Sequence, residues 1–478
     1  MGALGKITFN TIAAFAGRTL GGLVALASVA FIARSLGPSG FGAYGTIVAY
    51  LAIFQILADL GLYTLLTKEI AQKPEKEKEL VSQYFTLRLV VAVVFLSIAT
   101  ILVFAFPYSA EIKLGVVFTA VAFLFLSLSQ IFLGVFQKHI QVYKAAIAEV
   151  LGRVAQLGVV WYFFATDGTL FQYLSALIVG SFIIFVVNLL FVRRIIKFKI
   201  KVSTSEWRRI IKTTFPIAIS LVFTLLYFKA DIILLSVLQS EEDVGIYNAA
   251  YKVLETLIFF PAAFMGLMLP VISRYAKEAK EKLPQLLNTL TNIMVLSSLP
   301  LVAGGVILSS SFVYIIGGVE FLAATSTMMV LFLAIGIIFF GTLFGNSIIA
   351  LDLQKKAMKV YFWGFAFNFV ANIIFIPQYS YLAAAWTTVL TELLVTLWLI
   401  AIIKRKTEIG FSFKIFYKTV FATVVMGGVL LLFTAPIYEP QGILSFALLV
   451  LGGAAIFFTA MRLSGVSGDV MKFKRVIG

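Results

Sequence analysis

The chain has 478 residues, of which 61% are hydrophobic, with 38 Lys and Arg against 22 Asp and Glu. Soluble domains are roughly 45–50% apolar, so this composition indicates a membrane protein. The lack of cysteine excludes disulfides and thiolate chemistry, and the single histidine, His139, cannot supply a metal-ligand set. The net charge of +16 is spread over short segments between apolar runs, so it does not indicate nucleic-acid binding.

Apolar windows long enough to cross a bilayer recur along the whole chain. A hydrocarbon core about 30 Å thick requires about 20 apolar residues in a helix. The first window is too long for a cleavable signal peptide, and Arg18 interrupts it. The sequence predicts an all-α membrane protein with fourteen transmembrane helices, near residues 8–34, 41–67, 83–106, 114–137, 143–165, 170–192, 210–238, 247–271, 285–312, 323–351, 360–377, 382–403, 416–435 and 443–461.

The distribution of Lys and Arg predicts the orientation, because cytoplasmic loops are enriched in both. With a cytoplasmic N-terminus, 31 of the 38 Lys and Arg residues fall in inner segments, 2 in outer segments (Arg34 and Lys113) and 5 within spans. An odd number of spans would mix the two sides. We therefore expect a multi-pass protein of the cytoplasmic membrane with both termini in the cytoplasm.

The spans fall into two related halves. The longest inner loop, residues 193–212, follows six spans and precedes eight, and no loop is long enough for a soluble catalytic domain. FGAYG from Phe41 and VGIYN from Val244 share a Gly-x-Tyr at an offset of 203, and Lys144-Ala145 returns as Lys356-Ala357 at an offset of 212. Copies six spans apart share one orientation, so a parallel repeat is expected. The predicted domains are a six-helix lobe at 1–200, a second at 201–410, and two additional helices with a cytoplasmic tail at 411–478.

Ionisable residues occur inside many of the predicted spans. Lipid offers a charged side chain no hydrogen-bond partner, so such residues normally face a bundle interior or a wet cavity and are functional candidates. Counted from the span ends, Arg18 lies roughly 15 Å deep and Arg88 only roughly 8 Å, where its side chain could extend to the surface. The candidates are Arg18, Asp59, Arg88, Glu149, Arg153, Lys229, Asp231, Lys252, Glu255 and Glu392.

Spacing predicts how some of these charges pair. Residues three or four apart share a helix face, so Glu149 can neutralise Arg153, and Lys252 can neutralise Glu255. Such pairs are equally explained as structural contacts. Lys229 and Asp231 are two apart and point in different directions, and we expect Asp231 to pair with Lys252. Asp59 is expected to answer Arg18 from the adjacent span. Glu392 stands alone near a predicted midplane, where burial favours the neutral form.

Several segments together resemble a known family. They are ARSLGPSGFGAYG, LADLGLYTLLTKEIA, KADIILLSVL, VGIYNAAYKVLE and PAAFMGLMLPVISR, in this order. They resemble the Wzx-like polysaccharide-biosynthesis flippases of the multidrug/oligosaccharidyl-lipid/polysaccharide exporter superfamily. The resemblance implies two six-helix lobes in a MATE-like V, two added C-terminal helices, and alternating-access transport of a polyprenyl-linked oligosaccharide between leaflets. Lipid II flippases and multidrug antiporters share this fold, so the fold leaves the substrate open.

The charged positions suggest how such a lipid could be held. Its phosphate or pyrophosphate is the group that hydrocarbon rejects most strongly, and a ring of cations could replace its hydration. The expected substrate-binding residues are Arg18, Arg88, Arg153, Lys229 and Lys252. The expected charge partners or ion-coupling residues are Asp59, Glu149, Asp231, Glu255 and Glu392. Weaker candidates are Tyr50, Tyr247, Asn248 and Tyr251 for sugar contacts, where plain packing is an alternative, and Pro216, Pro261 and Pro300 for hinges.

Other functions are distinguished by what they would require. No GxxxxGK[ST] motif is present, so direct ATP use is not expected, and we expect no cofactor, no metal and no enzymatic activity. H⁺ or Na⁺ could drive transport, and a glycan polymerase or ligase could receive the product. A multidrug or cation antiporter is the first alternative, favoured by an acidic cavity. A membrane-embedded glycan polymerase or transferase would need a long outer loop, and a scaffold without transport would not need so many charges inside spans.

Overall fold

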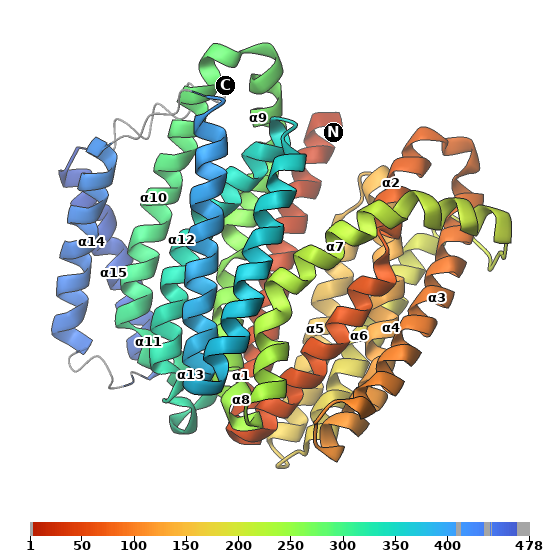
Figure 1. Ribbon diagram of the computed structural model, residues 1–478, viewed down its shortest axis with the longest axis horizontal. Helices are drawn as coiled ribbons and strands as arrows, with labels where there is room; N and C mark the ends of the chain where they lie inside the picture. Colours follow the sequence, from red (N-terminus) through yellow and green to blue (C-terminus); the bar gives the residue numbers. More distant parts are fainter. Residues whose placement is uncertain (1–2, 408–412, 435–439, 441, 466–478) are drawn as a thin grey trace. The chain divides into compact units, whose positions relative to one another are not determined.

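The structure is a computed structural model that describes residues 3–407, 413–434, 440 and 442–465, without the side chains of 3–9, 11–12, 216–228 and 413. All regular elements among these residues are helical (Figure 1). The α-helices are α1 Ala3–Asp59, α2 Leu62–Gln72, α3 Glu77–Leu102, α4 Ala110–Lys138, α5 Tyr143–Phe164, α6 Leu170–Arg193, α7 Thr204–Leu238, α8 Glu241–Leu257, α9 Phe259–Glu278, α10 Leu283–Ile307, α11 Ser309–Gly317, α12 Ala324–Ala350, α13 Gln354–Lys404, α14 Phe413–Thr434 and α15 Ile443–Leu463. Short 3₁₀ turns occupy Pro74–Lys76, Val103–Ala105, Lys280–Lys282 and Val319–Phe321.

The helices account for the fourteen predicted passes. Eleven helical segments among the described residues are long and apolar enough to cross a membrane. Two of them contain a sharp turn that divides each into two crossings, at Gly37 in α1 (φ 64°) and at Ser380 in α13 (φ 47°). The fourteenth crossing is α7, while α8 and α9 together form one crossing interrupted at Ile258. The predicted all-α, fourteen-helix fold is confirmed.

The turn between the first two crossings is much tighter than a loop. Gly37 takes a left-handed φ of 64° and Pro38 follows it, so the chain reverses within LGPSG while helical geometry resumes at once. A left-handed backbone costs glycine little because it lacks a Cβ. Ser380 makes the corresponding turn in α13 without that freedom, and this position was expected only as a short connection.

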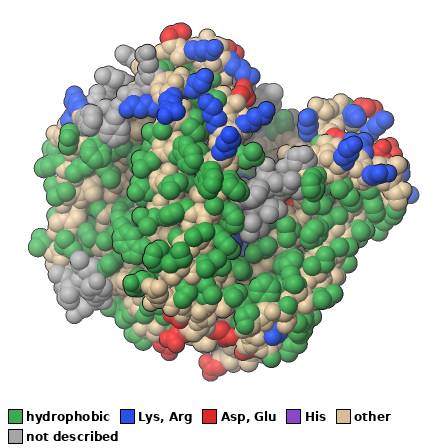
Figure 2. Space-filling model, viewed as in Figure 1, with side chains coloured by type: hydrophobic (Ala, Val, Ile, Leu, Met, Phe, Trp, Pro, Cys, Tyr) green, Lys and Arg blue, Asp and Glu red, His purple; other side chains and the backbone are tan. Residues whose placement is uncertain are grey.

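The chain folds into two compact units, Met1–Gly245 (unit 1) and Ile246–Gly478 (unit 2). The core of unit 1 gathers buried residues of α1, α2, α3 and α4, among them Tyr84, Phe132 and Phe136. In unit 2, α14 and α15 pack on α10 through Met426, Leu430 and the other members of a smaller apolar cluster. In each unit, Lys and Arg side chains gather at one end of the helices and leave apolar flanks below (Figure 2). The lobe boundaries expected from sequence stay a prediction.

The long inner loop is a packed segment in this structure. Residues 195–203 leave the turn after α6 and run along α3 without regular secondary structure, and they are called the strap here. The backbone N–H of Lys199 donates to Ser82 Oγ (3.1 Å), that of Lys201 donates to Thr86 Oγ1 (2.9 Å), and Lys201 Nζ contacts Glu79 Oε1 (2.6 Å). These contacts hold the strap against α3, and the strap leads directly into the start of α7.

Candidate functional site

The second crossing of unit 1 is a broken helix. It ends at Asp59, and α2 begins at Leu62 after two residues with positive φ, Leu60 (48°) and Gly61 (74°). A left-handed conformation costs a residue such as leucine roughly 1–2 kcal/mol, so it requires support from its surroundings. The break also leaves carbonyl groups at the end of α1 without helical partners.

Arg88 of α3 supplies that support. Its Nη1 donates to the Ala58 carbonyl oxygen (3.1 Å) and pairs with the Asp59 carboxylate, its Nε donates to the Ser127 carbonyl oxygen (3.2 Å), and its Nη2 donates to Gln130 Oε1 (2.6 Å). The residue is completely buried. A cation at the C-terminal end of a helix also favours the helix dipole. Arg88 therefore ties α1, α3 and α4 together at the break.

This arrangement corrects two expectations. Arg88 does not extend to the surface, because α3 begins at Glu77 rather than near residue 83, which places Arg88 about 16 Å along the helix. Asp59 pairs with Arg88 rather than with Arg18, because the helix break turns its carboxylate toward α3. Sequence spacing carries no sign of this pair, because the pair depends on a helix break that the sequence does not predict.

Arg18 lies on an exposed part of α1 beside a close helix contact. A Cβ on Gly17 would stand 2.6 Å from Ala146 Cβ, and one on Gly21 would stand 3.5 Å from Glu149 Cγ, so α1 and α5 approach closely at these glycines. Within the part of the chain that the structure describes, no carboxylate forms an ion pair with Arg18. Its guanidinium lies within electrostatic range of the Tyr63 hydroxyl.

Tyr63 connects Arg18 to the broken helix. The tyrosine hydroxyl lies near the Gln137 side chain and within electrostatic range of the Asp59 carboxylate. Gln130 and Gln137 are exposed and lie seven residues apart, so they share one face of α4. Polar side chains exposed within a membrane-crossing segment normally line water rather than lipid. We refer to Arg18, Asp59, Tyr63, Gln130 and Gln137 as the polar face of unit 1.

Arg153 of α5 is a second partly available cation. Its Nη1 donates to Gln156 Oε1 (3.1 Å), and its buried Nε has no partner among the described atoms. The expected ion pair between Glu149 and Arg153 is wrong, because Gln156 shares the same helix face and takes that donor while Glu149 packs against Gly21. Helical spacing permits a pair but does not select between two acceptors on one face.

The charged residues of α7 and α8 divide between the units. Lys229 is half-buried and Asp231 is 3% exposed, both in unit 1. In unit 2, Lys252 Nζ pairs with Glu255 Oε2 (2.7 Å), which confirms the pair predicted from three-residue spacing. A pairing of Asp231 with Lys252 stays a prediction.

Glu392 does not stand alone in unit 2. It is 8% exposed on the second crossing of α13 and lies within electrostatic range of the Tyr361 hydroxyl on the first crossing. Nearby, Asn372 Nδ2 donates to Asn368 Oδ1 (3.0 Å), and Asn368 Nδ2 donates to Thr391 Oγ1 (3.4 Å). The spacing of Tyr361, Asn368 and Asn372 by seven and four residues was the available signal for this buried polar stripe.

The weaker candidates have mixed surroundings. The Tyr50 hydroxyl donates to the Ala99 carbonyl oxygen (3.0 Å) and its ring packs on Phe54, so packing accounts for this residue. The rings of Tyr247 and Tyr251 stack with centroids 5.6 Å apart, and Asn248 Nδ2 is buried without a described partner.

The three prolines stand in different settings. Pro261 falls in the first turn of α9, where a missing N–H costs nothing, and Pro300 lies inside α10. The side chain of Pro216 lies outside the described residues. Among the described residues, no cluster of three or more His, Asp and Glu could hold a metal.

Comparison with known proteins assigns the chain to a family. The family described as "Polysaccharide biosynthesis protein" matches residues 7–276, which is more than half of the chain. The chain belongs to the polysaccharide biosynthesis protein family. A protein of Haloferax volcanii described as the probable low-salt glycan biosynthesis flippase Agl15 is 20% identical over 425 residues, 88% of each chain.

The chain shares its fold with solved structures of two other transporters. The lipid II flippase MurJ in an inward closed conformation matches 95% of this chain and 98% of its own with a TM-score of 0.77 and 15% identity. An inward-facing MATE multidrug transporter matches 83% of this chain and 98% of its own with a TM-score of 0.65 and 14% identity. These matches show that the chain shares the fold of these transporters, and the family match confirms the resemblance to polysaccharide-biosynthesis proteins seen in the sequence.

Proposed function

We propose that this protein is a flippase that moves a polyprenyl-phosphate- or pyrophosphate-linked oligosaccharide from the inner to the outer leaflet by alternating access. The polar face of unit 1 carries the proposal, because it exposes Arg18 without a carboxylate partner within a crossing segment. Arg153, with an unused buried N–H, lies on α5, which packs against the same stretch of α1. The Haloferax relative is named as a glycan flippase and MurJ as a lipid II flippase, and both names agree with transport rather than catalysis.

The residues then take distinct roles. Arg18 and Arg153 bind the lipid phosphate, with Lys229 and Lys252 as further cations. When no substrate is bound, these charges are balanced by the carboxylates of Asp59, Asp231, Glu149 and Glu255. Arg88 is reassigned from binding the substrate to holding the helix break, because protein acceptors already occupy most of its donors. Tyr247, Asn248 and Tyr251 remain proposed sugar contacts, and Pro216, Pro261 and Pro300 remain proposed hinges.

The deciding experiment compares Arg18→Gln with Lys113→Gln, a control in an outer segment. Both proteins are purified, their thermal unfolding is measured, and flipping of a fluorescent polyprenyl-pyrophosphate oligosaccharide is followed in vesicles. A lost charge-assisted contact is worth at least about tenfold in binding, so Arg18→Gln should lose most transport at an unchanged melting temperature while Lys113→Gln stays active. Wild-type transport by Arg18→Gln would remove Arg18 from the substrate site.

Ion-coupled export of drugs or cations is the second candidate, favoured by the buried Glu392 and its neighbour Tyr361. An acid in such a position can carry H⁺ or Na⁺, and Asp59 or Asp231 could do so as well. Glu392→Gln should make flipping independent of an imposed gradient if this acid couples transport. Export of an organic cation by vesicles that do not flip the oligosaccharide would favour the antiporter.

The membrane setting belongs to the same proposal. The protein resides in the cytoplasmic membrane with both termini in the cytoplasm, as the gathering of Lys and Arg at one end of each unit supports (Figure 2). Substrate would then enter from the cytoplasmic leaflet, and a glycan polymerase or ligase would receive it outside.

A further inference from the structure

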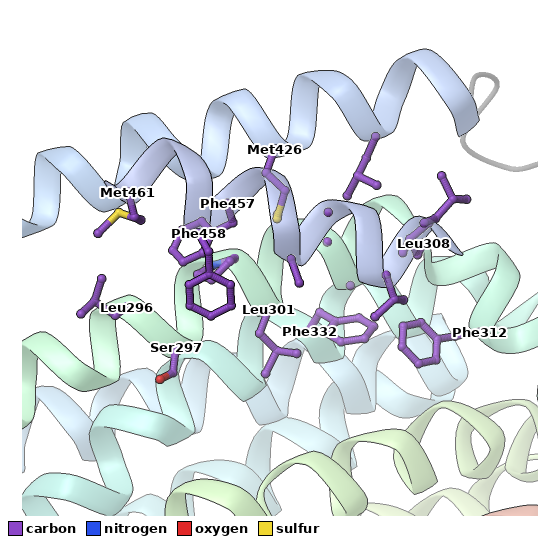
Figure 3. A pocket seen from close by; sticks show the side chains of 18 of the residues that line it. Leu296, Ser297, Leu301, Leu308, Phe312, Phe332, Met426, Phe457, Phe458 and Met461 are labelled. Atoms are coloured by element: carbon purple, nitrogen blue, oxygen red, sulfur yellow. The ribbon is translucent and has the colours of Figure 1, made fainter. Parts of the chain in front are cut away.

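A long apolar slot lies in unit 2 between α10 and the two additional helices. It has a volume of about 660 Å³, within the range of small-molecule sites. α10, α14 and α15 supply most of its wall, with Phe312 of α11 and Phe332 of α12 closing one end (Figure 3). The slot holds none of the charged residues assigned above to transport, so its occupant is a separate question.

Two glycines on facing helices leave room for the slot. Gly304 on α10 and Gly453 on α15 present no side chain to its interior. A Cβ on Gly304 would find only Met426 Cε within 4 Å, at 3.8 Å, which is ordinary contact. Helices in a bilayer have no hydrophobic drive to close such a gap, because a lipid chain fills it equally well.

The length of the slot matches one membrane leaflet. Leu296 and Leu308 mark its two ends along α10 (Figure 3). They are twelve residues apart, so the slot is about 18 Å long. One leaflet contributes about half of the 30 Å hydrocarbon core. A slot of that length suits the acyl chain of an ordinary phospholipid better than a longer polyprenyl tail.

One cation stands at an end of the slot. Arg462, in the last turn of α15, is exposed and lines the slot. It directly follows Met461, which lies at the end of the slot marked by Leu296 (Figure 3). Among the described residues no carboxylate pairs with it. The remainder of the lining is almost entirely apolar, so the chemistry is that of one hydrocarbon chain ending in an anion.

We propose that this slot binds one anionic phospholipid, with an acyl chain between α10 and α15 and its phosphate on Arg462. The lipid fastens the two additional helices to the rest of unit 2. This role is independent of substrate transport, and it makes the stability of the α14–α15 pair depend on membrane composition.

The experiment measures lipid retention and thermal unfolding of the purified protein in detergent with added dioleoyl phosphatidylglycerol or dioleoyl phosphatidylcholine. Wild type should retain one phosphatidylglycerol in native mass spectrometry and melt at a higher temperature with it. Gly304→Leu should lose retention of both lipids, and Arg462→Gln should lose about tenfold of the preference for the anionic lipid. Gly304→Ala, which the slot accommodates, tests a milder filling if the leucine variant folds poorly.

Matched controls use neighbouring positions outside the slot. Gly452 adjoins Gly453 but faces open space with no atom within 4 Å of a built Cβ, so Gly452→Leu should bind lipid normally. Lys414 is an exposed cation on α14 that does not line the slot, so Lys414→Gln should keep the preference for the anionic lipid. Normal lipid retention by Gly304→Leu, or an unchanged preference for the anionic lipid in Arg462→Gln, would overturn the proposal. Displacement of phosphatidylglycerol by equimolar polyprenyl phosphate would overturn it too, because the slot would then belong to the substrate.

Discussion

Gly42 of α1 and Gly245 of α8 pack directly against each other's backbone within unit 1. A Cβ on Gly42 would overlap the Glu241 carbonyl and stand 2.9 Å from the Gly245 nitrogen, and one on Gly245 would overlap the Pro38 carbonyl and stand 3.1 Å from the Gly42 nitrogen. Pro38 and Glu241 are separated by the same 203 residues as the two glycines. The contact is therefore reciprocal, and the glycines of the two Gly-x-Tyr motifs repeated in the sequence meet in space.

Gly42→Ala should destabilise this contact, because a methyl group has no space between the two helix starts. Overpacking of this kind costs typically about 1–3 kcal/mol. The measurement is the thermal unfolding midpoint of purified protein, with Gly158→Ala as control, since nothing lies within 4 Å of a Cβ there. Equal midpoints for the two variants would show that the helix starts separate without cost.

Arg88→Gln should strongly lower the free energy of unfolding. It leaves the buried Ala58 carbonyl and Asp59 carboxylate unpaired, and removing one partner of a buried ion pair costs about 3–5 kcal/mol. Asp59→Asn keeps an acceptor and should cost less. Unfolding in detergent by denaturant titration measures both, with the exposed Arg194→Gln as reference. If Arg88→Gln unfolds like Arg194→Gln, the break in the second crossing does not depend on this residue.

Arg209→Ala should loosen the start of α7 from α2. Arg209 Nη1 and Nη2 contact the two oxygens of Glu69 (2.6 and 3.1 Å), and its Nε contacts Glu206 (2.9 Å). The hydrogen bonds to Glu69 raise the pKa of Arg209 above its ordinary value, so the guanidinium stays charged wherever the protein is folded. Hydrogen exchange of the first turns of α7 should accelerate in Arg209→Ala and remain normal in Arg208→Ala, whose side chain makes no described ion pair. Equal exchange in both would assign the anchoring of α7 to the strap alone.

Topology can be tested with cysteines, because the chain contains none. Ser240 accepts the backbone N–H of Asp243 (3.1 Å) and caps α8, so replacing it would cost about 1 kcal/mol. The exposed Glu242 avoids that loss. Glu242→Cys should react with an impermeant maleimide from outside the cell and Lys280→Cys only after permeabilisation. Reaction of both from the same side would reject the predicted orientation.

The spans were predictable because membrane thickness requires long apolar runs, and the fourteen crossings follow from that requirement. The interruptions were not predictable. Leu60 carries no sequence signal for a left-handed backbone, and its conformation is stabilised by Arg88 from a helix 28 residues away. Without that break, the partner of Asp59 could only be assigned to the wrong arginine.

Charge pairs followed the sequence unevenly for a related reason. Lys252 and Glu255 meet as their spacing predicts. Glu149 and Arg153 also share a helix face, yet Arg153 donates its hydrogen bond to Gln156, and the Glu149 side chain packs against Gly21. Helical periodicity determines which side chains can meet, whereas tertiary packing selects among the acceptors. The same limit hid the neighbours of Glu392, which lie on another crossing.

The strap binds α3 through contacts that do not depend on its covalent link to α6 and α7. Since Ser82 and Thr86 hold it through backbone N–H groups, a synthetic peptide copying residues 195–203 carries the donors that α3 recognises. Such a peptide would compete in trans with the protein's own segment, and would displace it most readily when the connection between α6 and α7 is cut.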